Sequence, residues 1–173
     1  MSSSRVIFLT VVTAVCVCCV RQAPQRPSTR HGQAPEVDSA SLALIELNYR
    51  MAAGADRELA SYVQTSGEPY ALYDNNTWLL VTAKGEESIP LLGDEKHTMH
   101  LRLYDLQGRL LEDVQREYTI GRMELPLAVE GVLPELHPGA TARLLAPWYA
   151  AFGTTGTATV PPYTNIMIDL EIQ

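Results

Sequence analysis

The C-terminal end of the chain constrains the fold most, because apolar and polar side chains alternate over residues 165–172. Successive side chains of a β-strand point to opposite faces of the sheet, so this alternation predicts a strand with one face in a core. The side chains expected to face the core are Ile166, Ile168, Leu170 and Ile172, and those expected on the other face are Asn165, Met167, Asp169 and Glu171.

Other short strands are predicted upstream of this one. Residues 70–73 and 77–83 flank an Asp-Asn-Asn turn and together predict a β-hairpin. Residues 99–104 alternate in the same way and end at a turn over residues 106–108. A further short strand is predicted over residues 116–120. Together these segments predict an antiparallel sheet.

One short helix is predicted between the strands. Apolar residues recur at helical spacing over residues 127–136. Pro134 lies inside this segment and removes a backbone donor, so we expect the helix to be short or irregular. The expected fold class is therefore α+β, an antiparallel sheet wrapped on a short helix, with this domain spanning residues 70–173.

A helical lead-in is predicted over residues 37–66. Asp38 and Ser39 are suitable N-caps, and apolar residues follow at helical spacing. Gly54, followed by Asp56 as a possible second cap, predicts a break or kink between two helical pieces. Such an apolar stripe either packs on its own domain or pairs with a second copy. Packing on its own domain is the commoner case and the interpretation we favour.

The N-terminus has the pattern of an export signal over residues 1–18. Arg5 precedes an apolar run, residues 6–17, that is too short to span a bilayer comfortably. All three cysteines of the chain lie at the end of this run, so neither a disulfide framework nor a zinc site is expected in the folded domain. Residues 19–36 are rich in Pro, Gln, Arg and Ser, which predicts a disordered tether.

The position of the cysteines resembles the lipid-attachment box of bacterial lipoproteins, in which cleavage occurs before a cysteine that then carries lipid. Cys19 is the predicted lipidation site, because the residue before it, Cys18, is small, whereas valines precede Cys16 and Cys18. The alternatives are an ordinary signal peptide and an uncleaved anchor helix.

Composition and motifs exclude several classes of function. The 13 Lys and Arg against 20 Asp and Glu give a net charge of −7, which argues against a nucleic-acid partner. Phosphate-binding and dinucleotide-binding glycine motifs are missing, so no cofactor is expected. His97 and His100 fall on opposite faces of their predicted strand, which argues against a metal site. The oligomeric state cannot be derived from these patterns.

Residues 139–172 resemble the C-terminal half of the FKBP-type peptidyl-prolyl isomerases. The family's elements occur in order: a glycine turn, a strand ending at Pro147, an Ala-Phe-Gly loop at residues 151–153, a flexible segment, a Pro-Pro pair at residues 161–162 and a last strand. The resemblance extends back to about residue 94. The layout of lipid box, tether, helix and divergent domain is similar to FKBP-type lipoproteins of the Bacteroidetes, including those associated with gliding motility.

This resemblance implies an FKBP-like fold and a weak prolyl isomerase, or folding helper, that acts on proline-containing exported polypeptides. It also implies a lipid anchor in a bacterial membrane, facing the periplasm and in the outer membrane. The alternative is a non-catalytic FKBP-fold binding module, or a structural lipoprotein of an envelope complex.

The resemblance also implies which residues form the proline pocket. Phe152 stands where the family usually has a tyrosine, so the apolar wall is kept and the hydroxyl donor is lost. Val129 replaces the tryptophan of the pocket floor, which makes the floor smaller. Leu111 and Glu112 take the place of a phenylalanine-aspartate pair. The complete set of candidate residues is Leu101, Leu111, Glu112, Leu125, Val129, Phe152, Val160 and Ile168.

Overall fold

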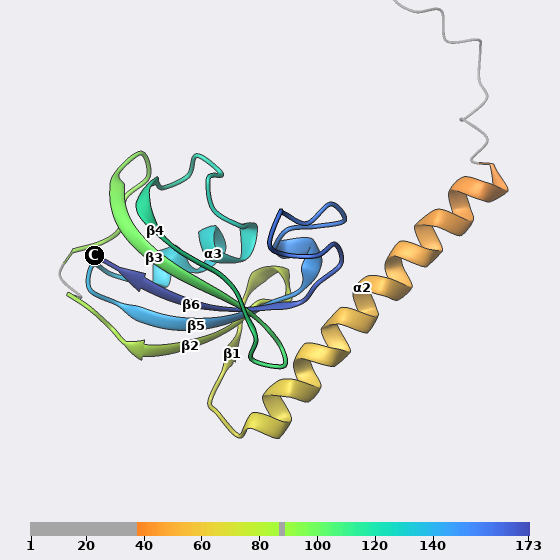
Figure 1. Cartoon of the computed structure of the whole chain (residues 1–173), viewed down its shortest axis with the longest axis horizontal. Coiled ribbons are helices and arrows are strands. Elements are labelled where there is room, and N and C mark those ends of the chain that lie inside the picture. The colour runs from red at the N-terminus through yellow and green to blue at the C-terminus, as the bar shows by residue number, and fades with distance from the viewer. Residues whose placement is uncertain (1–37, 87–88) are drawn as a thin grey trace, which may run out of the picture. The chain divides into compact units, whose positions relative to one another are not determined.

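A computed structural model describes residues 38–86 and 89–173 of the chain. Residues 39–173 form one compact unit that contains the sheet and the lead-in helix (Figure 1). The predicted export signal, the predicted lipidation site at Cys19 and the predicted tether lie outside the described residues.

The described unit is built on a six-stranded sheet in the order β1-β2-β5-β6-β3-β4, and all neighbouring strands are antiparallel. The predicted hairpin is confirmed, since Ala71 pairs with Leu79 and Leu72 with Trp78. The strands are β1 (Ala71–Leu72), β2 (Trp78–Ala83), β3 (Lys96–Asp105), β4 (Leu110–Thr119), β5 (Thr141–Ala146) and β6 (Ile166–Ile172).

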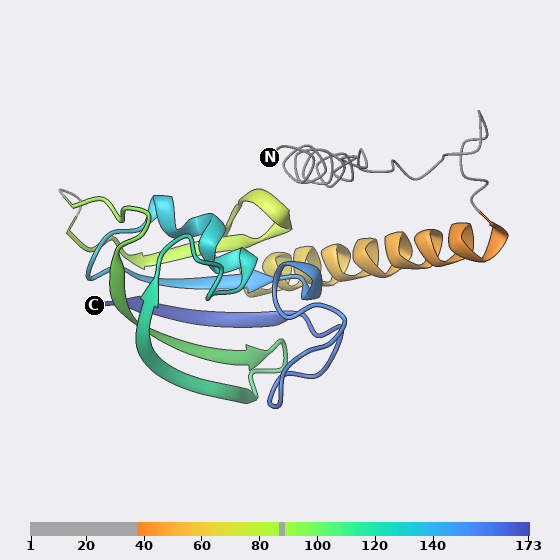
Figure 2. The same cartoon turned by 90° about the horizontal axis from the view of Figure 1, so that it is seen from above.

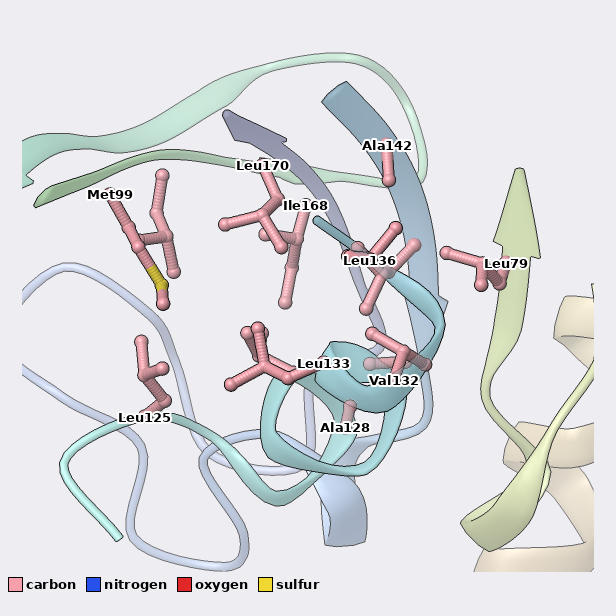
Figure 3. Close-up of a cluster of buried hydrophobic side chains, with 14 of the residues drawn as sticks. Leu79, Met99, Leu125, Ala128, Val132, Leu133, Leu136, Ala142, Ile168 and Leu170 are labelled. Carbon is pink, nitrogen blue, oxygen red and sulfur yellow. The ribbon is translucent and has the colours of Figure 1, made fainter. Parts of the chain in front are cut away.

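The main core lies between the inner face of the sheet and the short helix α3 (Leu127–Val132), seen in cyan in Figure 2. In Figure 3, Ile168 and Leu170 of β6 point toward Val132 and Leu133, and all four side chains are at most 2% exposed. The predicted alternation of β6 is thus confirmed for its apolar residues. Pro134 ends the α-helix as expected, because the chain continues as a 3-10 turn over Leu133–Glu135.

The lead-in helix α2 (Ser39–Ser66) is continuous, so the predicted break at Gly54 is wrong. A glycine inside a helix costs about 1 kcal/mol relative to alanine, which packing on the sheet can offset. Ala55, directly after Gly54, and Leu59, about one turn further on, are buried. Tertiary packing therefore keeps this part of the chain helical through the glycine.

A second core lies on the outer face of the sheet, where α2 covers it. Leu59 of α2 packs with Tyr70, Leu145 and Met167, and each of these side chains is at most 9% exposed. Met167 was expected on an open face of the last strand. The strand is instead buried on both faces at this end, because α2 covers the outer one.

The first half of α2 differs from the second in its exposure. Leu42 is 55% exposed, Leu44 62% and Tyr49 71%, whereas Leu59 is completely buried. The favoured interpretation, that the helix packs on its own domain, therefore holds for the second half of α2 alone. Figures 1 and 2 show the first half of the helix extending past the strands. Among the described residues, no helix is both long and apolar enough to cross a membrane.

Strand β4 is longer than predicted. The sequence indicated a strand over residues 116–120, whereas β4 pairs with β3 from Leu110 to Thr119. The turn that joins them is stabilised by Asp105, whose carboxylate accepts hydrogen bonds from the backbone N–H of Arg109 at 2.8 Å and of Gln107 at 3.1 Å. These bonds, above all the one from Arg109, hold the pKa of Asp105 below its usual value.

Candidate functional site

A cavity of about 310 Å³ opens on the inner face of the sheet beside the edge strand β4. Its walls come from β3, β4, the segment before α3 and the loop between β5 and β6. This volume lies at the lower end of the range for small-molecule sites. The lining residues are Leu101, Leu103, Glu112, Val114, Arg116, Tyr118, Glu124, Leu125, Pro126, Phe152, Thr157, Ala158 and Thr159.

The strand side of the cavity follows from the register of β3 and β4. Leu101 pairs with Val114, and Leu103 pairs with Glu112. Directly paired residues share a face of the sheet, so all four side chains point inward. Leu101 and Leu103 are 3% and 2% exposed and belong to the main core. The cavity is therefore an extension of that core toward solvent.

The loop after β5 supplies Phe152 and depends on glycine for its path. Gly156 has a φ of +67°, and an added Cβ would lie 2.3 Å from the carbonyl oxygen of Val160. No L side chain fits such a position. The turn is closed by backbone hydrogen bonds from Gly156 to Phe152 at 3.1 Å and from Thr157 to Val160 at 2.8 Å. Phe152 packs against the main core from this loop.

Glu112 ties the tip of this loop to the sheet. Its Oε2 accepts a hydrogen bond from the Thr159 hydroxyl at 2.6 Å. Glu112 belongs to β4 and lines the cavity. The contact joins two walls of the site that are 47 residues apart in the chain.

The candidate residues divide into two groups in the structure. Leu101, Glu112, Leu125 and Phe152 line the cavity. Val129, Val160 and Ile168 are 0%, 1% and 0% exposed and belong to the core behind it. Leu111 lies at an irregularity of the β3–β4 pairing and packs partly buried against the same core.

Val129 was expected to form a reduced pocket floor, but it does not reach the cavity surface. A valine side chain is too short to fill the space of an indole ring from the same position. Val160, expected as a wall residue, is covered in the same way. The apolar surface of the cavity is formed by Leu101, Leu103, Leu125 and Phe152 instead.

Three residues of β4 that line the cavity were not among the candidates from the sequence. Val114, Arg116 and Tyr118 point into the cavity at every second position of the strand. Arg116 lies over the ring of Tyr118, with its guanidinium carbon 4.5 Å from the ring centroid. The inner face of residues 112–118 mixes charged and apolar side chains, so the sequence of this strand resembles that of a polar loop.

Helix α2 is joined to the loop that carries Phe152. The Asn165 side chain donates to a Glu58 carboxylate oxygen at 2.7 Å and accepts from the backbone N–H of Trp148 at 2.9 Å. Tyr149 donates its hydroxyl hydrogen bond to Asp56. Burial and this hydrogen bond raise the pKa of Tyr149 to about 12.

Trp148 and Tyr149, just before the loop, do not line this cavity. Trp148 lines a separate cavity beside α2 with Ile45 and Tyr49. Both aromatic residues therefore brace the loop against the helix rather than line the candidate site.

The arrangement supports binding and conformational chemistry. An aromatic ring and three leucines form a partly desolvated apolar surface, which suits a small apolar ring. Glu112 and Arg116 add charged groups to the lining of the same cavity. Among residues 38–86 and 89–173, no group of His, Cys, Asp and Glu side chains could hold a metal ion.

Comparison with known proteins identifies the fold. No protein-family model and no curated protein sequence matches the chain. Solved structures do match: AtFKBP13 aligns with a TM-score of 0.54 at 16% identity, over 60% of this chain and 95% of the other. The N-terminal domain of FKBP42 from Arabidopsis thaliana aligns with a TM-score of 0.53 at 17% identity, over 61% and 90%. The chain therefore contains an FKBP-like α+β fold preceded by an N-terminal helix.

Proposed function

We propose that the FKBP-like unit of this chain is a peptidyl-prolyl isomerase, or folding helper, for exported proline-containing polypeptides. The observation that supports this most is the open cavity of about 310 Å³ beside Phe152, lined by apolar residues of the sheet and of the segment before α3. A pocket filled by its own side chains would have favoured a structural role.

The proposed catalysis needs no nucleophile and no metal. Rotation about an X-Pro bond passes through a twisted amide at a barrier of about 18–20 kcal/mol. A water-poor apolar pocket lowers this barrier if it binds the twisted form better than either planar form. Phe152, Leu101 and Leu125 supply such a surface. Since phenylalanine carries no hydroxyl to donate to the twisted amide, we expect the activity to be weak.

The test is two-dimensional exchange spectroscopy on a short X-Pro peptide with residues 36–173, whose folding is verified by the amide spectrum. We expect faster interconversion with the wild-type protein and none above background with Phe152→Ala. Tyr49→Ala is the matched control, because it also removes an aromatic ring but lies on α2, 71% exposed. A folded wild-type protein that leaves the rate unchanged would contradict the isomerase proposal.

The second candidate is a non-catalytic binding module of an envelope complex. The exposed apolar half of α2, with Leu42, Leu44 and Tyr49, favours it because such side chains are usually covered by a partner. Such a module should bind its partner equally well with Phe152→Ala and less well with Tyr49→Ala. For an isomerase, the exchange measurement should instead show a loss of activity with Phe152→Ala and none with Tyr49→Ala.

We further propose that the chain is exported and lipid-anchored in the bacterial envelope through Cys19. Three cysteines at the end of an apolar run support this. Acyl chains contribute about 0.8 kcal/mol per buried CH₂, so a multiply acylated cysteine holds a protein on a membrane durably. Cys19→Ala should abolish metabolic acyl labelling and release the protein from the membrane pellet. Labelling that persists at the wild-type level would assign the lipid to another residue.

A further inference from the structure

Three charged side chains line the proposed proline cavity, and two of them are already occupied by partners in the chain. Glu112 accepts the hydrogen bond from Thr159 at 2.6 Å. Glu124 accepts a hydrogen bond from the backbone N–H of Thr119 at 3.1 Å. The third, Arg116, is the one positively charged side chain among them.

Arg116 is held in a defined place without an ionic partner. Its guanidinium carbon lies 4.5 Å from the ring centroid of Tyr118, which is 4% exposed and therefore fixed. In the described part of the chain, Arg116 forms no salt bridge and no side-chain hydrogen bond. Stacking on the ring leaves the N–H groups at the edge of the guanidinium plane free for an acceptor.

Glu112 and Arg116 lie at different places along the cavity wall. They are four residues apart on one strand, so at about 3.3 Å per residue their Cα atoms are separated by roughly 13 Å. The Glu112 carboxylate bonds to Thr159 of the opposite wall.

We propose that the cavity selects proline residues that have an acidic neighbour, whose carboxylate pairs with Arg116 while the proline ring contacts Phe152 and the leucines. The inference rests on the proposed function in that the ligand is a proline-containing peptide. It goes further by naming the chemistry of the residue beside the proline and the side chain that recognises it.

The experiment compares matched peptides on the full chain. Two series of short peptides carry Glu, Gln or Lys immediately before or immediately after a single proline. Binding is followed by amide chemical shifts of the protein, and catalysis by exchange spectroscopy of the peptide. An exposed ion pair is worth 0.2–1 kcal/mol, so we expect Glu to be preferred over Gln by about 1.4- to 5-fold in one series.

Variants test whether Arg116 is responsible. Arg116→Gln should remove the difference between Glu and Gln peptides, and Arg116→Lys should keep part of it. Arg102→Gln is the matched control, because it removes the same charge from the opposite face of the neighbouring strand β3. High salt should weaken the preference of the wild-type protein.

The outcomes separate this inference from the proposed isomerase activity. A Glu preference in binding that Arg116→Gln removes supports the inference even if no peptide is isomerised, in which case the isomerase proposal fails alone. Isomerisation with equal rates and affinities for Glu, Gln and Lys peptides overturns the inference and leaves the activity standing. A preference for Lys, or a Glu preference that survives in Arg116→Gln, also overturns it.

Discussion

At the scale of single residues, the absence of a hydroxyl group on Phe152 limits the proposed catalysis. Its ring closes the apolar side of the cavity, but it cannot donate a hydrogen bond. The charged side chains of the same cavity are Glu112, Arg116 and Glu124, and Glu112 is bonded to Thr159. The site therefore offers apolar contact over most of its surface and one free cation at its edge.

Phe152→Tyr should raise the rate of X-Pro interconversion. The added hydroxyl can donate to the amide oxygen, and a neutral hydrogen bond made mainly to the twisted state is worth about 1 kcal/mol, or roughly fivefold in rate. Exchange spectroscopy on the same peptide measures the change. A lower rate in a folded Phe152→Tyr variant would show that the hydroxyl points away from the peptide.

The Tyr149 hydroxyl should make stability depend on alkaline pH. Its pKa is raised to about 12 by burial and by its hydrogen bond to Asp56, against about 10 in the unfolded chain. The contribution of the protonated hydroxyl to the free energy of unfolding is therefore complete below pH 10 and is lost as the pH rises through 12. The difference in urea stability between wild type and Tyr149→Phe should shrink across this interval. A difference that stays constant would mean that the hydroxyl titrates equally in both states.

At the scale of elements, β6 is the strand on which both cores depend. Its inner residues pack under α3, and Met167 packs on the outer face under α2. An alternating pattern is usually taken to mean one buried and one solvated face. In β6, Asp169 and Glu171 near the C-terminal end suggest a solvated outer face. At the N-terminal end of the strand, however, both faces are buried, the inner one in the main core and the outer one under α2.

Ile168→Asp and Met167→Asp should both destabilise the fold by several kcal/mol. Each places an unpaired carboxylate among apolar side chains, at positions that are 0% and 7% exposed. Denaturant unfolding measures the loss, and Glu171→Ala on the outer face should have a small effect. If Met167→Asp were as mild as the control, α2 would not cover this end of the strand in solution.

At the scale of the whole molecule, helix α2 acts as two different halves. The second half completes a core with the outer face of the sheet and reaches the Phe152 loop through Asn165 and Tyr149. The first half leaves large apolar side chains in solvent. Folding of the unit and recognition of a partner are therefore expected to depend on different residues of one helix.

Leu59→Ala should cost about 2–5 kcal/mol of unfolding free energy, because it leaves a cavity in a completely buried site. Leu44→Ala is the matched control on the same helix, since Leu44 is 62% exposed and its loss should change stability by less than about 0.5 kcal/mol. Urea unfolding of residues 36–173 compares the two. Similar losses at both positions would mean that the first half of α2 is covered as well.

The amino-acid sequence was sufficient for those features that depend on neighbours in the chain. The alternation of residues 166–172, the hairpin around the Asp-Asn-Asn turn and the shortening of α3 at Pro134 all follow from local stereochemistry. Phe152 of the Ala-Phe-Gly loop, a candidate residue from the sequence, lines the cavity.

Tertiary structure alone decided which of these elements meet and what covers them. The full length of β4 depends on its pairing with β3, because an edge strand with charged inner residues has no clear pattern of its own. Gly54 stays helical and Met167 is buried because α2 packs on the outer face. Val129 is core rather than cavity surface, because burial depends on contacts between segments distant in the chain. For the same reason the exposed side chain of Arg116 borders the cavity.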